Sequence, residues 1–573
     1  MSSLSRTEPN VARYLLRAIR DEGVDHVFLV PGFMVEPFLS EFIPAGVTPI
    51  VACQEGGAAY MADGYARSTL NFGVAMGIGG PGVSNMVTAV SAAYSDRSPV
   101  LIVAGNVPFT WEGEGTFQDS SATGVEDRDL FLPMTVFAEV IPDPTLVGSF
   151  VRKAIKAMKG LENRPAFLSV PRDMQTAPLA YDYKPVGAVE APRILDAEAA
   201  RKVPELLASS TRITVLAGNG AVWSNASAEL RSFAAEYAIP VVTTQRAKGA
   251  IPEDDALSMG VFGVGGSMWA NQVVMGNTQS SIPGSEVLIV LGATLNENNT
   301  HGWLPGFVPS KAMVRVDINP NNVLGKEYQQ SFITGDVRSF LGWLQSNRAG
   351  YHNSLKATAA ARQAWLESIR KTPYYDTDAD RTSNAVPMNP ARVIAELRRA
   401  APRNTVLVVD SGAHTFFTGH NWTSYEPDEF LLLSTTGPMG YGVAMTIGAK
   451  LARPSQPHCA VVGDGSLLMH GMEIHTAVRY KVPMVITVIN NSALGNVYLR
   501  ALHESAEAVR LAEIPTQDWA AFSKSLGGDG VVVEQPAELP AAFERAFATT
   551  DRPFVVDARC DRNCPTPNTQ EGP

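Results

Sequence analysis

Short aliphatic runs that alternate with helix-like segments recur along the whole chain, and they constrain the fold more than any other feature. Strands separated by helices pair in parallel and are covered by those helices, so the pattern predicts an α/β fold made of βαβ units. Each third of the chain carries four such runs. They are HVFLV (26–30), GVAMGI (73–78), PVLIVAG (99–105), AFLSVP (166–171), ITVLAGNG (213–220), PVVTT (240–244), VLIVLGA (287–293), MVRVDINP (313–320), TVLVVDSG (405–412), HCAVVGDG (458–465), PMVITVINN (483–491) and FVVDAR (554–559).

The grouping of these runs predicts three doubly wound parallel-sheet domains, within the range expected for 573 residues. Between the groups the pattern lapses into polar, proline-bearing sequence at residues 176–192 and 371–390. The predicted domains are therefore residues 1–180, 193–350 and 385–573.

Composition excludes several classes of function. The formal charge of −11 argues against a protein that captures nucleic acid or anionic membrane with its whole surface. Three long segments, residues 68–95, 256–285 and 430–449, carry no charge, but each is interrupted by glycine and polar residues, so none is expected to span a membrane. The start of the chain lacks the pattern of a signal peptide, and its cysteines are too sparse for a disulfide framework. We therefore expect a cytoplasmic protein whose four thiols, Cys53, Cys459, Cys560 and Cys564, are free.

Gly463-Asp464-Gly465 and the later Asn490-Asn491 carry the clearest chemical signal. Each follows a predicted strand, and the carboxyl ends of parallel strands meet at the edge where α/β folds bind ligands. Carboxylate and amide oxygens at that edge suit Mg²⁺, which keeps places for phosphate oxygens. The glycines let backbone N–H groups approach a phosphate. An isolated Gly-Asp-Gly is usually only a turn, but the paired asparagine favours a metal and diphosphate site.

This pair of motifs resembles the metal and diphosphate signature of thiamine diphosphate enzymes. The segment from Gln54 to Arg67 resembles the strand end and helix that carry the cofactor-activating glutamate of that family. Resemblance covers nearly the whole chain and is strongest to acetolactate synthases and pyruvate oxidases. It implies thiamine diphosphate and Mg²⁺ as cofactors, and a pyrimidine-binding, a central and a diphosphate-binding domain in that order.

The resemblance also implies roles for individual residues. Glu55 would be the activating acid, because a carboxyl group hydrogen-bonded to the aminopyrimidine promotes its shift to the imino form. Gly437 and Met439 would hold the aminopyrimidine, and Gly412, Ala413, His414, Gly465 and Ser466 would contact the diphosphate. Asp464, Asn491 and the carbonyl of Ala493 would bind the metal.

The substrate side of the site departs from acetolactate synthases. Gln118 resembles their Phe-Gln-acid element and could offer an amide to a substrate oxygen. Phe33 and Met34 are bulky where those enzymes tend to have small residues, and Arg500 stands where they tend to have tryptophan. These residues are predicted to line the substrate pocket, and they leave the substrate open.

The middle third resembles the flavin-binding central domain of acetolactate synthase at residues 260–271 and 291–296. The same fold holds ADP, or nothing, in other relatives. An FAD or an ADP-type nucleotide is therefore an open alternative for the central domain.

Together these features predict an enzyme, a transferase or lyase that acts on a small 2-oxo acid by decarboxylation or acetolactate-synthase-like carboligation. The alternatives are a 2-hydroxyacyl-CoA or oxalyl-CoA type lyase, a flavin-dependent 2-oxo acid oxidase and a non-catalytic nucleotide-binding relative. The resemblance further implies a homodimer at minimum and favours a tetramer, with Glu55 and Asp464 of one site contributed by different chains.

Overall fold

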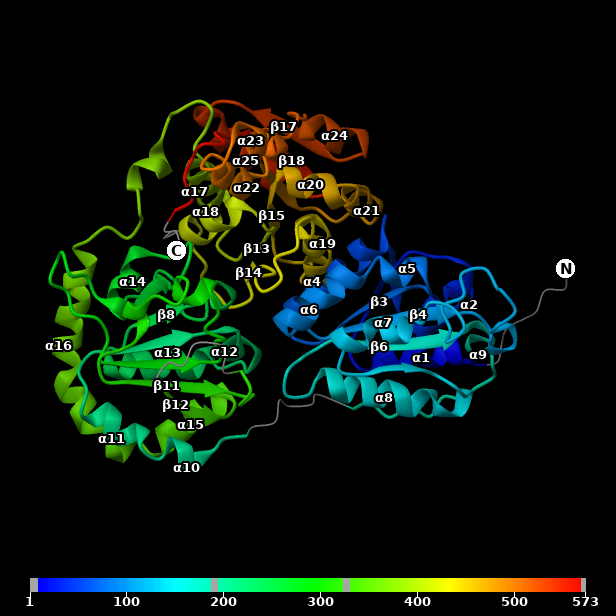
Figure 1. The fold of residues 1–573 in the computed structure, drawn as a ribbon, viewed down its shortest axis with the longest axis horizontal. Helices are drawn as coiled ribbons and strands as arrows, with labels where there is room; N and C mark the ends of the chain where they lie inside the picture. The colour runs from blue at the N-terminus through cyan, green and yellow to red at the C-terminus, as the bar shows by residue number, and fades with distance from the viewer. Residues whose placement is uncertain (1–8, 187–193, 323–329, 568–573) are drawn as a thin grey trace.

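Three six-stranded parallel sheets, one in each third of the chain, make up the computed structural model, which describes residues 9–186, 194–322 and 330–567 (Figure 1). The predicted α/β class with three domains is confirmed at the level of these sheets. The predicted limits at residues 1, 193 and 573 and part of the linker 176–192 lie outside the described residues.

The first and third sheets share one strand order. In the first sheet it is β2-β1-β3-β4-β6-β5, and in the third it is β14-β13-β15-β16-β18-β17. The strands of the first are β1 (His26–Leu29), β2 (Thr48–Val51), β3 (Gly73–Ile78), β4 (Val100–Asn106), β5 (Ala138–Val140) and β6 (Ala166–Pro171). Those of the third are β13 (Val406–Val409), β14 (Phe430–Leu431), β15 (His458–Gly463), β16 (Val485–Asn490), β17 (Asp529–Val533) and β18 (Phe554–Arg559).

The second sheet has the order β12-β11-β10-β7-β8-β9, the arrangement of dinucleotide-binding domains. Its strands are β7 (Ile213–Ala217), β8 (Val241–Thr243), β9 (Ser258–Val261), β10 (Val287–Leu291), β11 (Ala312–Asp317) and β12 (Gln330–Thr334). The order reverses between β7 and β10, so the loops that follow these two strands diverge and open a crevice.

The twelve runs predicted as strands are all strands, and they are the four inner strands of each sheet. The six strands that the pattern missed are the two edges of each sheet. Inner strands are covered on both faces and both sides and therefore read as continuous aliphatic runs. Edge strands are short or partly exposed: β2 reads TPIV, β5 reads AEV, and β14 has two residues.

Helices cover both faces of every sheet (Figure 1). The longer helices of the first two domains are α1 (Val11–Asp21), α4 (Glu55–Thr69), α6 (Val87–Asp96), α8 (Val147–Met158), α13 (Ser227–Tyr237), α14 (Met268–Met275), α15 (Val337–Ser346) and α16 (His352–Arg370). Those of the third domain are α17 (Pro390–Ala400), α18 (Ala413–Asn421), α19 (Gly442–Ala452), α20 (Asp464–His470), α21 (Glu473–Arg479), α22 (Gly495–Ala501), α23 (Ala506–Ala512), α24 (Trp519–Ser525) and α25 (Leu539–Ala548). None of the described helices combines the length and apolar character needed to cross a membrane.

Helices α4 and α19 join the first and third domains through direct backbone contact. A Cβ atom on Gly64 would lie 2.1 Å from the carbonyl oxygen of Met445, and one on Gly448 would lie 1.8 Å from that of Met61. Both positions therefore require glycine. The close approach lets apolar residues of the two domains form one continuous core, whereas the central domain has clusters of its own.

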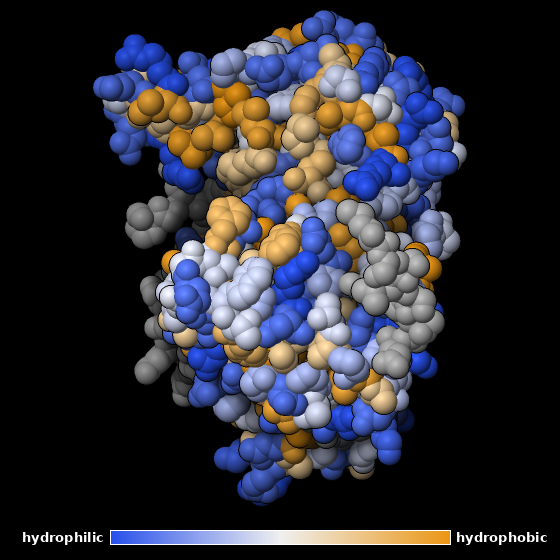
Figure 2. Space-filling view, turned by 90° about the vertical axis from the view of Figure 1, so that its right-hand side faces the viewer, coloured by the Kyte–Doolittle hydropathy of each residue, from blue (hydrophilic) through white to orange (hydrophobic). Residues whose placement is uncertain are grey.

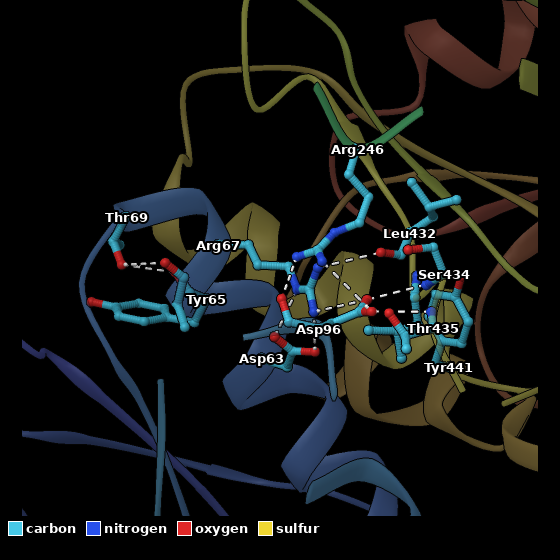
Figure 3. A network of polar contacts seen from close by, with 12 residues as sticks. Asp63, Tyr65, Arg67, Thr69, Asp96, Arg246, Leu432, Ser434, Thr435 and Tyr441 are labelled. Carbon is cyan, nitrogen blue, oxygen red and sulfur yellow. Dashed lines mark hydrogen bonds and ion pairs between the residues drawn. The ribbon is translucent and has the colours of Figure 1, made fainter. Parts of the chain in front are cut away.

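All three domains meet at the buried carboxylate of Asp96, at the end of α6 (Figure 3). Arg67 of α4 lies 3.5 Å from it, and Arg246 of the central domain lies 3.6 Å from it. The backbone N–H groups of Ser434 and Thr435, from the third domain, each donate to it at 3.1 Å. Burial alone would raise the pKa of Asp96, but Arg246 and Arg67 hold it below the usual value, so the carboxylate stays charged.

We predict that Gly448→Ala lowers the midpoint of thermal unfolding, because the new methyl group would overlap the backbone of α4. Overpacking of this kind costs about 1–3 kcal/mol and can cost more against backbone. Gly342→Ala in α15 is the matched control, since a Cβ there meets nothing within 4 Å. Alanine at that site should leave the midpoint unchanged or raise it. Equal midpoints for Gly448→Ala and the wild type would contradict the proposed packing.

Candidate active site

The strand order of the third sheet places its ligand crevice between β13 and β15. In parallel sheets, ligands bind where the connections after two neighbouring strands run to opposite sides. The segment after β13 leads through Gly412 into α18, and the segment after β15 leads through Gly463 into α20. Both helices begin at this edge of the sheet, so their free N–H groups are available there for an anion.

A cavity occupies this crevice, and its lining residues all lie in the third domain. The ten residues predicted to bind the cofactor line it, and so does Arg500. The lining comprises Pro390, Ser411, Gly412, Ala413, His414, Phe417, Gly437, Met439, Gly463, Asp464, Gly465, Ser466, Ile489, Asn491, Ala493, Leu494, Gly495, Asn496, Val497, Leu499, Arg500, Asp561, Arg562 and Cys564. Segments far apart in the sequence thus converge on one chamber.

Asp464 holds an unsatisfied carboxylate oxygen in the cavity wall. Its side chain is buried, Oδ1 accepts from the N–H of Gly465 at 2.8 Å, and Oδ2 has no hydrogen-bond partner among the described residues. Burial raises the pKa of Asp464 to about 6, although nearby backbone N–H groups work in the opposite direction. A buried carboxylate oxygen without a partner is costly unless a ligand meets it.

The donors around Asp464 fit a hard divalent cation. The Asn491 side chain lines the same cavity, and its Oδ1 lies 3.2 Å from the backbone nitrogen of Ala493. Within the described ranges, no cluster of three or more His, Cys, Asp or Glu forms a metal site. One carboxylate, one amide and one backbone carbonyl are oxygen donors, which Mg²⁺ prefers and which leave positions for phosphate oxygens.

His414 is a neutral imidazole packed between glycine backbones. A Cβ on Gly412 would lie 2.6 Å from the ring, and one on Gly463 would lie 3.1 Å from it. Burial lowers the pKa of His414 to about 4, and its Nε2 has no partner in the part of the chain that the structure describes. The ring therefore offers one hydrogen bond to a ligand without adding charge.

Asp410, which the sequence analysis did not assign, holds the loop that carries Met439. The carboxylate accepts from the N–H of Gly440 at 2.9 Å and from that of Gly442 at 2.8 Å. Burial raises its pKa to about 7 against these hydrogen bonds. The loop is thereby tied to the end of β13. An aspartate directly after a buried strand was the available sequence signal.

Glu55 lies at the first turn of α4, outside the cavity of its own chain. Its Oε2 accepts from the Asn85 amide at 2.9 Å, and its Oε1 would lie 3.5 Å from a Cβ on Gly82. Gln118 lies near the loop of residues 79–82, because its backbone carbonyl oxygen would be 4.0 Å from a Cβ on Gly80. The structure thus groups Glu55 and Gln118 around residues 79–82 of the first domain and does not bring them to Asp464.

Phe33 and Met34, which were also predicted to line the substrate pocket, are separate from the cavity. Phe33 is 46% exposed, stacks on Trp111 at 6.5 Å between ring centroids, and lies under the Arg172 guanidinium at 4.0 Å. The Met34 side chain is buried, and its backbone oxygen accepts from Gln175 at 2.8 Å. In the single chain, the Phe33 side chain is therefore partly exposed and the Met34 side chain packs in the interior.

The buried carboxylate of Glu473 fixes the start of α4. It accepts from the backbone N–H groups of Cys53 and Gln54 at 3.2 Å, and it lies where a Cβ on Gly57 would be only 2.2 Å away. Glu473 belongs to α21 of the third domain, and Gln54 immediately precedes Glu55. The third domain therefore positions the glutamate of the first.

Residues after the last strand form a wall of the cavity that the sequence did not reveal. Asp561, Arg562 and Cys564 line the chamber, and Arg562 pairs with Glu513 at 2.8 Å. Cys560 and Cys564 are free, as predicted. No local motif marks this segment, because its position depends on how β18 returns beside β16.

Comparisons with known proteins agree with this architecture. Residues 9–125 match the N-terminal TPP binding domain of thiamine pyrophosphate enzymes, residues 200–344 the central domain, and residues 410–558 the C-terminal TPP binding domain. The probable acetolactate synthase large subunit of Methanocaldococcus jannaschii is 30% identical, over 96% of this chain and 92% of the relative.

The chain belongs to the thiamine pyrophosphate enzyme family. The acetolactate synthase large subunit of Parasynechococcus marenigrum is 29% identical over 96% of this chain and 88% of its own length. That of Haemophilus influenzae is 26% identical over 96% and 94%. The thiamine pyrophosphate enzyme described here is thus similar to these proteins over 96% of its length, and its cofactor is thiamine diphosphate.

We predict that the pH dependence of stability of the cofactor-free enzyme reports on Asp464. Because its folded-state pKa of about 6 exceeds the ordinary 3.8, the stability that it contributes is complete below about pH 4 and is lost as the pH rises through 6. Between about pH 4 and pH 7 the wild type should lose up to about 3 kcal/mol relative to Asp464→Asn.

Chemical denaturation of the two proteins across this pH range measures the effect. Thiamine diphosphate with Mg²⁺ should restore stability at neutral pH to the wild type but not to Asp464→Asn. Parallel pH profiles for the two proteins would show that the Asp464 carboxylate is not a costly buried charge.

Proposed function

We propose that this enzyme acts on 2-oxo acids, with acetolactate-synthase-like carboligation as the favoured reaction. The similarity to acetolactate synthase large subunits along 96% of the chain carries the proposal. Thiamine diphosphate, when bound, supplies an electron sink for the carbon next to the departing carboxyl group. Two molecules of 2-oxo acid and one proton then give CO₂ and one 2-hydroxy-3-oxo acid. Without an acceptor, one 2-oxo acid and one proton give CO₂ and an aldehyde.

The alternative classes have less support. The acyl-CoA lyase and flavin oxidase alternatives are not favoured by relatives named acetolactate synthase. A non-catalytic relative would have no need to retain a costly buried carboxylate at Asp464 beside Asn491. Glu55, the proposed acid, is likewise present at the start of α4.

We assign the metal ligands to Asp464, Asn491 and the carbonyl oxygen of Ala493, and the ion to Mg²⁺. The unpartnered Oδ2 of Asp464 supports this assignment, because a cation would satisfy it. Ser466 would donate a hydrogen bond to the diphosphate and His414 would contact it, and Gly437 and Met439 would hold the aminopyrimidine from the loop anchored by Asp410.

We further propose that each complete site uses two chains, so that the enzyme is a homodimer at minimum. The cavity is lined only by the third domain, whereas Glu55 and Gln118 lie in the first. Apolar side chains gather on the upper half of the face in Figure 2. Leu468, Met469 and Met472, on and beside α20, are each more than half exposed at 57, 53 and 51%. Such surface suits burial against a second copy.

Activity of mixed variants tests both proposals. The wild type, loaded with thiamine diphosphate and Mg²⁺, should release CO₂ from pyruvate or another simple 2-oxo acid. Glu55→Ala and Asp464→Ala homodimers should each be nearly inactive. Unfolding and re-mixing them in equal amounts should restore about a quarter of all sites, because half of random dimers are mixed and each mixed dimer has one intact site.

Two failures of this experiment are distinct. Absence of CO₂ release from every 2-oxo acid by the loaded wild type would overturn the proposed reaction. Mixed dimers that form by mass but remain inactive would instead show that Glu55 acts within its own chain or is not the activating acid.

A flavin or ADP-type nucleotide is proposed for the crevice of the central domain. A cavity lies there beyond the ends of β7, β10 and β11, lined by Gly220, Gly292, Asp317 and also Arg246. The first two are in close contact, since a Cβ on Gly292 would lie 2.6 Å from the Cα of Gly220. Glycine backbone and a nearby cation suit a diphosphate-bearing nucleotide at the switch point.

Absorbance and calorimetry decide which nucleotide this crevice takes. We expect a yellow protein or, in colourless preparations, micromolar-range affinity for FAD that Arg246→Ala weakens. Binding of ADP but not FAD would favour a nucleotide without flavin. Failure of both to bind would remove the cofactor from the central domain.

A cytoplasmic location is proposed from the four free cysteines, which suit a reducing compartment. The three domains are proposed to extend over residues 1–180, 193–350 and 385–573.

A further inference from the structure

Arg500 is the one charged side chain lining the cavity of the third domain that has no partner among the residues that the structure describes. Four charged side chains line this cavity. Asp464 is the proposed metal ligand, and Arg562 is paired with Glu513 at 2.8 Å. Asp561 accepts from the backbone and side-chain nitrogens of Asn563, both at 2.9 Å. The Arg500 guanidinium makes no hydrogen bond or ion pair within the described chain and is free to meet a ligand.

The backbone of Arg500 lies apart from the residues proposed to hold the metal and the diphosphate. Helix α22 begins at Gly495, against the residues proposed to hold metal and phosphate: a Cβ on Gly495 would lie 2.9 Å from Ala413 and 3.1 Å from the Asn491 amide. Arg500 lies five residues further along this helix, roughly 7 to 8 Å along its axis. Its backbone is therefore farther along the helix than those residues, while its side chain lines the same cavity.

We propose that Arg500 binds a second anionic group of the substrate, the distal carboxylate of a dicarboxylic 2-oxo acid. This inference rests on the proposed function. A guanidinium presents parallel N–H groups that match a carboxylate. The carboxylate next to the carbonyl is lost as CO₂, and a cation that stabilised it in the ground state would retard that loss. A cation is useful instead against a carboxylate that stays on the substrate throughout the reaction.

A cation in the last turn of α22 also suits the helix dipole, so the test must separate this effect from ligand binding. Arg500→Lys retains the charge but loses the planar pair of donors. Arg500→Gln loses both. Arg510→Gln, on the exposed surface of α23, removes one positive charge elsewhere and is the matched control.

The experiment compares 2-oxoglutarate with 2-oxohexanoate, which has a similar length but no distal charge, by CO₂ release from the enzyme loaded with thiamine diphosphate and Mg²⁺. We expect kcat/KM to favour 2-oxoglutarate. Arg500→Gln should lower that preference by about ten- to a hundredfold, as expected for a lost charged hydrogen bond. Arg500→Lys should restore part of it, and Arg510→Gln should change it by less than about twofold.

Glutarate, which cannot be decarboxylated in this way, provides a binding readout that does not depend on turnover. Calorimetry on the loaded wild type should detect glutarate binding that Arg500→Gln abolishes, while the affinity for thiamine diphosphate stays the same. If no 2-oxo acid releases CO₂, the proposed function fails and the glutarate titration still decides the role of Arg500. A preference for 2-oxohexanoate, or glutarate binding that is equal in wild type and Arg500→Gln, would overturn the inference.

Discussion

The contact between α4 and α19 is the constraint on which the rest of the arrangement depends. Gly64 and Gly448 let the two backbones touch, and no larger side chain fits at either place. The chain enters α4 through Glu55 and enters α19 directly after the loop that carries Met439. Both proposed cofactor-contacting segments therefore start from the ends of one rigid helix pair. Glu473 adds a second tie from the third domain to the start of α4.

Polar groups buried at the active site cost stability that the rest of the fold must supply. Asp464 and His414 line the cavity, and each has a buried atom without a hydrogen-bond partner among the described residues. Burial raises the pKa of Asp464 and lowers that of His414, so it favours the neutral form of both. Asp410 is buried but satisfied by backbone N–H groups, and Asp96 is buried but paired with two arginines. The contrast separates groups that organise the protein from groups that are proposed to meet a ligand.

Sequence patterns predicted the structural elements that depend on burial. They missed the features that depend on contacts between distant parts of the chain. The inner strands of all three sheets were predictable because covered strands are aliphatic. Asp464 and Asn491 were predicted to converge because parallel strands end at one edge. Edge strands escaped notice because they are short or polar. The cavity wall at Arg562 was missed because it depends on the path of the chain after β18, which no local pattern encodes.

The first and third sheets have the same strand order, and α4 and α19 hold the same place in it, each following the second strand. Gly64 of α4 and Gly448 of α19, each of which lies against the backbone of the other helix, are thus counterparts. A single ancestral α/β unit that paired with its own copy through this helix, and later became fused into one chain, would have this arrangement. One half of such a pair could then specialise in holding a charged ligand and the other in activating it, while the shared helix contact preserved their mutual orientation.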